Sequence, residues 1–270
     1  MPELPEVETT RRGLEPHLCG RRIVSVEVRQ PRLRWPVPAD LATQVRGQAI
    51  RALKRRGKYL LFELEAGHLI IHLGMSGSLR LSHRADFGKH DHVIFTLDDG
   101  RFLVLRDPRR FGAVLWWADP VETHPLLRDL GPEPLSPEFD GAWLYRRSRG
   151  SHRAVKNFLM DQHVVVGIGN IYANEALFTA GIDPRRPAGR IGRRRYDRLA
   201  RAVKAVLERA IGQGGTTLRD FVNEEGRPSY FQLALQVYGW AGKPCPRCRT
   251  PIERITLGQR ATYLCPRCQR

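Results

Sequence analysis

The spacing of apolar residues differs between the first and the second half of this chain. Near the start, apolar residues at mostly helical spacing end at Gly20, which predicts a first helix over residues 4–18. Beyond it the apolar residues gather in short runs bounded by Gly, Asp and Pro, as is typical of strands. Many strands at short spacing without intervening helices predict a β-sandwich or a barrel. The runs are IVSVEV (23–28), YLLFELE (59–65), LIIHLG (69–74), HVIFTL (92–97), RFLVL (101–105) and AVLWWA (113–118).

The second half follows a helical pattern. A short connector containing two glycines, HVVVGIGN at 163–170, joins the first two expected helices and indicates a helix-turn-helix with Asn170 at the N-cap. Gly167 and Gly169 leave backbone N–H groups that suit a phosphate, although a plain αα-hairpin would show the same pattern. The expected helices span 154–162, 171–180 and 193–211.

The apolar spacing changes from strand-like to helical at residues 131–140, GPEPLSPEFD. This stretch contains three prolines, three acids and no periodicity. Such a stretch indicates a domain boundary. We therefore expect an α+β chain with an N-terminal β-sandwich domain, a linker, a helical domain and a short C-terminal element. Their expected bounds are 1–131, 132–140, 141–240 and 241–270.

Basic residues dominate the charge of the chain. Lys and Arg number 45 against 28 Asp and Glu, a net charge of +17, which favours a polyanionic partner. Nucleic acid is favoured over an anionic membrane, because no apolar run approaches about 18 residues and no basic amphipathic helix is evident. The opening MPELPEVETT lacks the basic and apolar regions of a secretion signal, so we expect a cytoplasmic protein.

Four of the five cysteines form two close pairs, CxxC and CxxC, separated by sixteen residues. This spacing matches a zinc ribbon, in which each pair supplies two thiolates to one tetrahedral ion. Four protein ligands leave no position for water, so we expect one structural Zn²⁺; a redox pair or chance clustering are the alternatives. Cys19 is left over, and Arg260, beside the Gly258–Gln259 turn, is the residue of this element best placed to reach a partner. The expected ligands are Cys245, Cys248, Cys265 and Cys268.

The N-terminus carries candidate chemistry of another kind. Removal of Met1 would expose Pro2 as a secondary amine whose reference pKa is near 8, and such an amine can attack a sugar C1′ to form an iminium. Glu3 is placed to transfer protons, and Lys58 in KRRGKYLL is a second amine at the edge of a strand. Each also has a plain interpretation as a helix-start Pro, a Glu that complements the helix dipole and a surface Lys.

Taken together, these motifs resemble the formamidopyrimidine-DNA glycosylase family essentially from end to end. The resemblance implies a helix-two-turn-helix domain and a zinc finger behind the β-sandwich, and a bacterial, nucleoid-associated enzyme that removes oxidised purines such as 8-oxoguanine from duplex DNA and cleaves the strand. The motifs are PELPEVET, RRGKYLL, HLGMSGSLR, KHDHV, DPRRFG, LGPEPL, VGIGNIYANEALF, QGGTTLRDF, LQVYG and the four-cysteine finger.

The resemblance also implies roles for single residues. Pro2 would be the nucleophile that forms a Schiff base, Glu3 the general acid acting on the deoxyribose, and Lys58 a proton donor in β-elimination. Arg260 would grip the phosphates beside the lesion and assist the second, δ, elimination. One chain is sufficient for this chemistry, so a monomer is expected.

Base excision requires the damaged nucleotide to leave the stack, and the resemblance implies which residues fill the hole. Phe111 would act as an apolar wedge with Met75 beside it, and Arg109 would hydrogen-bond the orphaned cytosine. Without the family, Met75 and Phe111 would be read as core residues. His90 and Asn170, with Arg260, would contact backbone phosphates. The run 213–232 would cover the damaged base.

Two arginine-rich stretches are open to two interpretations, general attraction to phosphate or merely solvated faces. Two other functions also compete: a sister enzyme that excises oxidised pyrimidines, and a non-catalytic zinc protein that binds DNA. The second of these leaves the N-terminus and Lys58 without a purpose. The stretches comprise Arg146, Arg147, Arg149, Arg153 and Lys156, and the run 193–195.

Overall fold

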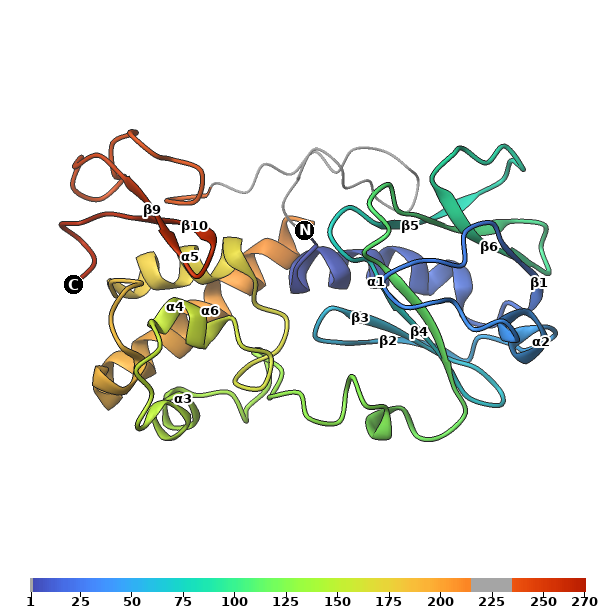
Figure 1. Ribbon diagram of the computed structural model, residues 1–270, viewed down its shortest axis with the longest axis horizontal. Coiled ribbons are helices and arrows are strands. Elements are labelled where there is room, and N and C mark those ends of the chain that lie inside the picture. The colour runs from blue at the N-terminus through green and yellow to red at the C-terminus, as the bar shows by residue number, and fades with distance from the viewer. Residues whose placement is uncertain (1, 215–234) are drawn as a thin grey trace. The chain divides into compact units, whose positions relative to one another are not determined.

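The computed structural model describes residues 2–214 and 235–270, which form two compact units (Figure 1). The first unit comprises residues 2–128, and the second comprises 129–212 together with 235–270. Among these residues, no helix is long and apolar enough to cross a membrane.

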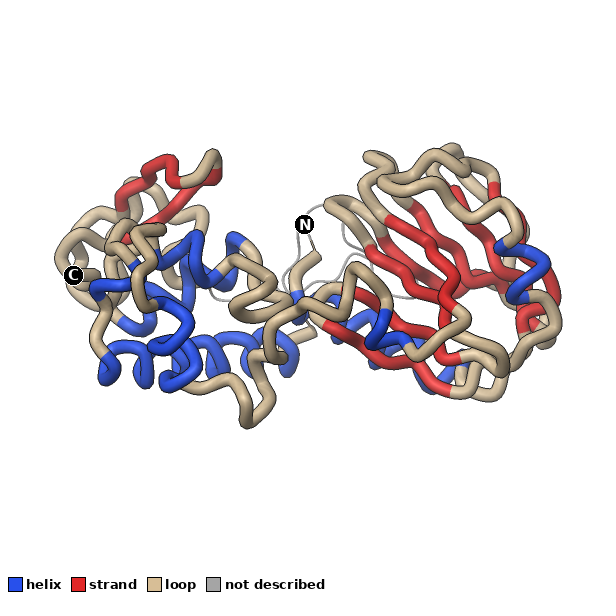
Figure 2. The backbone as a smooth tube through the Cα atoms, turned by 60° about the horizontal axis from the view of Figure 1, so that its bottom comes forward, coloured by secondary structure: helices blue, strands red, loops and turns tan. Residues whose placement is uncertain are grey.

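The first unit is a β-sandwich preceded by a helix, as the sequence predicts (Figure 2). Helix α1 spans Leu4–Leu18, and both sheets are four-stranded and antiparallel. One sheet has the order β1 (Ile23–Val28), β6 (Asp91–Leu97), β7 (Phe102–Arg106) and β5 (Ser78–Ser82). The other has the order β2 (Ala52–Arg56), β3 (Tyr59–Glu63), β4 (His68–His72) and β8 (Ala113–Trp117). Short helices α2 (Leu41–Val45) and η1 (Val121–Thr123) lie in the connections.

One hydrophobic core joins α1 to both sheets. Its apolar side chains include Leu14 from α1, Phe62 from β3 and Phe95 from β6, all fully buried. Two strands, β2 and β5, were not predicted, because ALKRR and SLRLS are too polar to show an apolar run. They form because each pairs with a neighbouring antiparallel strand: β2 pairs with β3, and β5 pairs with β7.

The second unit is helical and ends in a β-hairpin. Helix α3 was not predicted; it begins where the carboxylate of Asp140 accepts a 2.7 Å hydrogen bond from the backbone N–H of Trp143, an N-cap. Helix α4 is shorter than predicted, because Asp161 accepts from the N–H of His163 and turns the chain. The elements are α3 (Gly141–Ser148), α4 (Val155–Leu159), α5 (Asn170–Ala180), η2 (Ala188–Arg190), α6 (Arg193–Gly212), β9 (Glu253–Leu257) and β10 (Arg260–Leu264).

The proline-rich segment expected to be a linker, residues 132–140, packs within the second unit. The division between the units falls between Arg128 and Asp129. The carbonyl of Pro132 accepts from the N–H of Val166 at 3.2 Å, and Phe139 is fully buried. Apolar burial and backbone hydrogen bonds therefore hold this segment in place, although its composition is that of a linker.

The predicted N-cap at Asn170 is wrong. Helix α5 begins at Asn170 itself, and Gly169, with extended φ and ψ of −123° and −156°, occupies the N-cap. The side chain of Asn170 is engaged elsewhere, because its Nδ2 donates to the carbonyl of Ala261 on the hairpin at 2.9 Å.

Candidate active site and zinc centre

The N-terminal candidates lie just before helix α1. Glu3 occupies the N-cap, with φ −103° and ψ −170°, so Pro2 lies outside the helix rather than in its first turn. The carboxylate of Glu6 accepts a 2.8 Å hydrogen bond from the N–H of Glu3, which is the arrangement of a capping box. Pro2 is buried, and Glu3 is only 2% exposed. Capping thus fixes the direction in which Pro2 leaves the helix and holds an acidic side chain beside it.

Lys58 lies in the two-residue turn that joins β2 to β3, and it is 6% exposed. The nearby His72 is half-buried, and desolvation together with the positive charge of Lys58 lowers the pKa of His72 to about 3. The Nδ1 of His72 accepts from the N–H of Gly74 at 2.9 Å, which is consistent with a neutral imidazole. Lys58 is therefore a cation beside an uncharged ring in a largely buried setting.

A buried carboxylate ties α1 to the turn that carries Lys58. The Nε of Arg55 donates to Oε2 of Glu8 at 3.0 Å, and Nη1 of the same Arg55 donates to the carbonyl of Gly57 at 2.9 Å. Glu8 lies on the helix that follows Pro2 and Glu3, while Gly57 precedes Lys58. Arg55 therefore bridges the two segments that carry the candidate nucleophile and the candidate proton donor.

The same carboxylate also holds two arginines of its own helix. Arg11 and Arg12 donate to Glu8 at 3.0 Å and 2.8 Å, and Arg11 reaches the carbonyl of Leu53 on β2 at 3.2 Å. Burial raises the pKa of Glu8, but the hydrogen bonds from Arg11, Arg12 and Arg55 outweigh burial and lower it to about 2. The pairs with Arg11 and Arg12 were visible in the sequence as helical spacings of three and four. The link to Arg55, 47 positions away, was not.

Met75 and Phe111 project from the first unit. They are 37% and 43% exposed, and with Val24 they are the only large hydrophobic side chains exposed among the described residues. The guanidinium of Arg109 lies 5.0 Å from the ring centroid of Phe111. An interpretation as core residues is therefore excluded for both Met75 and Phe111.

Backbone contact and one buried acid hold these two loops together. Gly74 has φ +65°, and a Cβ there would lie 2.4 Å from the carbonyl carbon of Phe111, so the position requires glycine. The carboxylate of Asp107 accepts from Ser76 Oγ at 3.2 Å and from the N–H groups of Arg109 and Gly112 at 3.3 Å and 2.7 Å. Asp107 thus connects the loop of Met75 to the loop of Arg109 and Phe111.

His90 lies at the root of the same loop. Its carbonyl accepts from the N–H of Asp107 at 2.9 Å, and its ring centroid is 6.2 Å from that of His92. The Nε2 of His92 is 2.9 Å from the carbonyl of Asp107. This backbone hydrogen bond to Asp107 holds the half-buried His90 next to the projecting loop.

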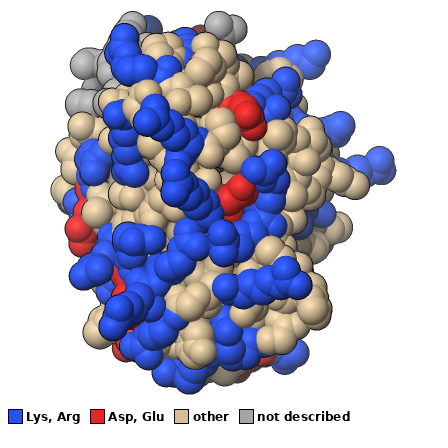
Figure 3. All heavy atoms as spheres, turned by 90° about the vertical axis from the view of Figure 1, so that its left-hand side faces the viewer, with Lys and Arg blue, Asp and Glu red and all other residues tan. Residues whose placement is uncertain are grey.

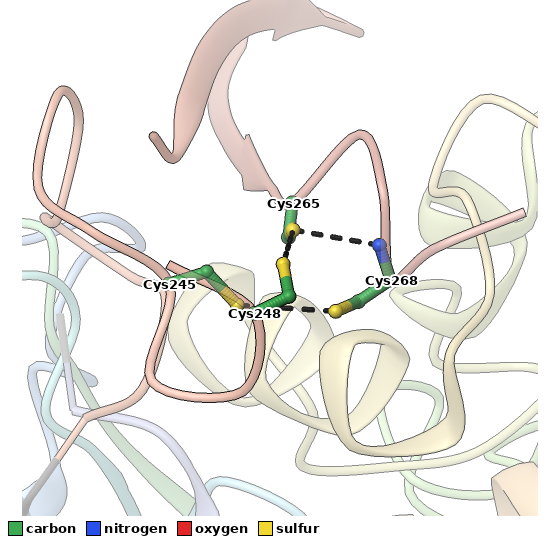
Figure 4. A group of neighbouring side chains, drawn as sticks. All are labelled: Cys245, Cys248, Cys265 and Cys268. Carbon is green, nitrogen blue, oxygen red and sulfur yellow. Dashed lines mark hydrogen bonds between the residues drawn. The ribbon is translucent and has the colours of Figure 1, made fainter. Parts of the chain in front are cut away.

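The four cysteines converge from two knuckles, as Figure 4 shows. All four sulfurs lie within 4.8 Å of one another; Cys245 Sγ is 3.9 Å from Cys268 Sγ, and Cys248 Sγ is 3.5 Å from Cys265 Sγ. A tetrahedral zinc with Zn–S bonds of about 2.3 Å sets its sulfurs about 3.8 Å apart, which these distances fit. The predicted structural zinc site is confirmed.

The electrostatics of the cluster oppose the formation of four thiolates in the absence of a cation. Hydrogen bonds from Thr250 lower the pKa of Cys248 to about 6, whereas burial and the other three thiols raise that of Cys268 to about 12. Four adjacent thiolates therefore do not form without a compensating charge, which Zn²⁺ supplies. The cluster packs on Phe178 of α5 and on Ile252, so the metal supports the hairpin from within a small core.

Arg260 is the exposed first residue of β10, directly after the Gly258–Gln259 turn. Both turn residues have positive φ, 56° and 60°, as in a type I′ hairpin. Asn170 holds the hairpin through Ala261, and its Oδ1 is buried without a hydrogen-bond partner among the described residues. Arg260 is thus presented at the tip of a hairpin that α5 anchors.

Lys156 contradicts the interpretation as a phosphate-attracting or solvated side chain. It is fully buried, and its Nζ donates to Thr262 Oγ1 at 2.6 Å and to the carbonyl of Ala261 at 3.2 Å. Its role is to fasten the hairpin to α4. Residues 215–232 of the predicted covering loop lie outside the described residues.

The candidate residues are therefore divided between the units. Those of the first unit lie at the N-terminus of α1, in the β2–β3 turn and in the two loops that Asp107 connects. In the second unit, Asn170 and Arg260 lie where the start of α5 contacts the hairpin, and the four cysteines pack near the other end of α5. The first group is Pro2, Glu3, Lys58, Met75, His90, Arg109 and Phe111, and the second is Asn170, Arg260 and the four cysteines.

Three family models match the chain in order. Residues 1–114 match the formamidopyrimidine-DNA glycosylase N-terminal domain, residues 130–222 match the H2TH domain of the same enzymes, and residues 242–270 match the zinc finger found in FPG and IleRS. A formamidopyrimidine-DNA glycosylase of Methylococcus capsulatus is 59% identical, with all of both chains covered.

Solved structures agree with these matches. The MutM (Fpg) protein of Thermus thermophilus is 41% identical with a TM-score of 0.89, covering 99% of this chain and 98% of that one. The Lactococcus lactis Fpg in complex with DNA containing an abasic site is 36% identical with a TM-score of 0.91, covering 99% of each chain.

Proposed function

The chain belongs to the formamidopyrimidine-DNA glycosylase family, and we propose that it excises oxidised purines, 8-oxoguanine and formamidopyrimidines, from duplex DNA and then cleaves the strand by β,δ-elimination. One observation carries the proposal: Pro2 stands outside α1 beside the buried Glu3, and Arg55 ties this helix to the turn of Lys58. An amine, an acid and a second amine are thereby held on connected elements of one unit.

The chemistry assigns a separate task to each group. After removal of Met1, the lone pair of the Pro2 nitrogen attacks C1′ of the damaged nucleotide, the bond from C1′ to the base breaks, and an iminium forms. Glu3 donates a proton to O4′ of the deoxyribose as the C1′–O4′ bond breaks, and this ring opening lets the Pro2 nitrogen form the C=N bond of the iminium. Lys58 supplies a proton during β-elimination, and Arg260 assists the δ-elimination that releases the second phosphate.

Access to C1′ requires that the base be turned out of the helix, which costs a few kcal/mol of stacking. The exposed side chains of Met75 and Phe111 can fill the space that the everted base leaves in the stack. Proteins that bend DNA insert apolar side chains between base steps in the same way. Arg109, stacked on Phe111, supplies donors for the unpaired cytosine. Asp107 keeps the wedge and the arginine in fixed relation.

Phosphate contacts position the duplex without reading its sequence. We assign these contacts to His90, Asn170 and Arg260, of which Arg260 depends on the zinc for its place on the hairpin. One chain carries every group that the reaction needs, so we propose a monomer. We propose that it works in the cytoplasm, at the nucleoid, and its similarity to bacterial DNA-repair enzymes supports this.

Borohydride trapping on a duplex with one 8-oxoguanine opposite cytosine tests the proposal. We expect a covalent adduct whose peptide map ends at Pro2, and no adduct with Pro2→Gly. Pro5→Gly, a change to another proline of the same segment, is the matched control and should retain the adduct. An adduct that survives Pro2→Gly with its attachment at another residue contradicts the mechanism. Retention of Met1 in the purified protein would leave the proposed nucleophile blocked.

The same substrates separate the competing functions. Faster release of thymine glycol than of 8-oxoguanine would assign the chain to the oxidised-pyrimidine branch. Tight binding of lesion DNA without base release or strand cleavage would indicate a non-catalytic zinc protein.

A further inference from the structure

Arginine side chains crowd one side of the second unit, around the C-terminal end of α5 and the first turns of α6. Figure 3 looks onto the side that carries the end of the chain, where many Lys and Arg side chains gather with few acidic groups between them. An open hollow of about 420 Å³ belongs to this region; it is lined by Asp183, Arg185, Arg186, Pro187, Arg190 and Arg270. We define the arginine face as Arg185, Arg186, Arg190, Arg194, Arg198, Arg201 and Arg270.

The arginine face is poorly neutralised. Of its seven members only Arg185 forms an ion pair among the described residues, with Asp183 at 2.6 Å. Four of them, Arg185, Arg186, Arg190 and Arg270, line the same hollow, and burial followed by the positive charges of Arg186 and Arg198 lowers the pKa of the neighbouring Arg195. Clustered like charges destabilise a fold, so a surface of this kind is best satisfied by a polyanion.

Helix α6 arranges part of the face as a row. Arg194, Arg198 and Arg201 are exposed, and spacings of four and three place them on one side of the helix. At 1.5 Å per residue the row is about 10 Å long, and one strand of DNA presents a phosphate every ~3.4 Å along its axis. The row therefore spans about three phosphates. No acidic residue lies in the first turn, so these charges add to the positive end of the helix dipole.

The arginine face is separate from the candidate lesion contacts of its own unit. Asn170 begins α5 and Gly181 caps its other end, where Arg195 donates to the Gly181 carbonyl at 3.3 Å. Eleven helical residues span about 16 Å, so the face and the Asn170–hairpin junction lie at opposite ends of this helix.

Charge is the means of attraction that this face offers. The large hydrophobic side chains exposed among the described residues are Val24, Met75 and Phe111, all in the first unit. Most protein partners dock through apolar or aromatic anchors, and a membrane surface needs an apolar face to insert. A phosphate backbone needs neither, and it binds arginine through paired charge-assisted hydrogen bonds.

We propose that the arginine face binds the phosphate backbone of a second segment of duplex DNA, distinct from the segment that holds the lesion. The choice of DNA as partner rests on the proposed function. Contacts of this kind carry no base specificity. They keep the enzyme attached to DNA while its lesion site releases one segment and samples another.

The test uses full-length, zinc-loaded protein saturated with a short duplex containing an abasic-site analogue. A longer, undamaged, fluorescent duplex is then added, and its binding is measured by anisotropy over a range of salt concentrations. We expect the saturated protein to bind the second duplex. The variant with Arg194→Gln, Arg198→Gln and Arg201→Gln should bind it at least about tenfold more weakly near 0.1 M salt, with the slope of log affinity against log salt reduced by about 3.

Two controls keep the result specific. Lysine at the same three positions preserves the charge and should preserve most of the slope, and both variants should bind the abasic duplex as the parent protein does. The proposal is overturned if the saturated protein binds no second duplex, or if the glutamine variant binds it equally well. It is also overturned if phosphatidylserine vesicles bind the face and the duplex does not. Loss of preference for the abasic duplex over undamaged DNA would instead contradict the proposed function.

Discussion

Glu8→Gln should destabilise the first unit in a manner that depends on pH. In the parent protein the Glu8 carboxylate accepts from Arg11, Arg12 and Arg55, and the substitution removes its charge while leaving Arg11 and Arg55 largely buried. A pKa lowered from 4.5 to about 2 corresponds to roughly 3 kcal/mol of differential stabilisation of the charged form. We therefore expect a loss of about 2–3 kcal/mol in the free energy of unfolding at pH 7.

The sign of the pH dependence follows from the direction of the shift. A carboxyl whose folded-state pKa is lowered contributes stability that is fully present above its unfolded pKa, here 4.5, and is lost as pH falls through the folded value near 2. The difference between the parent and Glu8→Gln should therefore be constant at neutral pH, shrink below about pH 4.5 and approach zero near pH 2.

Urea unfolding of both proteins, followed by circular dichroism at a series of pH values, measures this difference. Glu15→Gln is the matched control: Glu15 pairs with the same Arg11 at 2.8 Å, but its side chain is 44% exposed, so its loss should cost no more than ~0.5 kcal/mol. A difference between the parent and Glu8→Gln that stays unchanged from pH 7 to pH 3 would refute the assignment of the stability to the ionised carboxylate.

Three further predictions concern the projecting loops and the hairpin. Phe111→Ala should leave the free energy of unfolding within about 0.5 kcal/mol, because the side chain is exposed, while excision from a paired duplex falls at least tenfold; Val24→Ala, another exposed apolar position, should leave excision unchanged. Lys156→Met should cost about 2 kcal/mol in the second unit, because Thr262 and Ala261 lose a buried donor, and weaker binding of lesion DNA should accompany it; a variant with unchanged stability would contradict the assigned contacts. Removal of zinc by a chelator should abolish binding of lesion DNA before it affects the β-sandwich, as measured by anisotropy and by unfolding; unchanged affinity in metal-free protein would show that Arg260 does not depend on the finger.

The sequence was informative wherever a pattern is local. Helix α1 has the predicted bounds, the six apolar runs are strands, and the four cysteines converge at their expected spacing. Each of these follows from a period or a spacing within about thirty residues. Helix α3 also had a local signal that was overlooked, since Asp140 lies three residues before Trp143 in the manner of an N-cap.

Contacts between distant segments had no such signal. Strand β2 looks polar, and only its pairing with β3 makes it a strand. Lys156 lies among arginines in the sequence, but it is buried because the hairpin, more than a hundred positions later, folds over it. Asn170 was predicted to cap its own helix, and it instead supports Ala261. In each case the partner that determines the role is remote in sequence.

Because several acidic side chains are buried, the net charge of the whole chain differs from the charge at its surface. Among the residues that the structure describes, six acidic side chains are buried against two Lys or Arg, and the acids hold backbone groups and arginines in place, as Asp107 does for the loops of Met75 and Phe111. Because these negative charges are withdrawn from the surface, the exterior is more cationic than +17 indicates. A duplex that meets this surface releases counterions at every contact, so affinity for any DNA should fall steeply with salt. Preference for the lesion, which we propose depends on Arg109 and Phe111, should persist after much of that general affinity is lost, because base eversion depends on shape and hydrogen bonds that salt screens weakly.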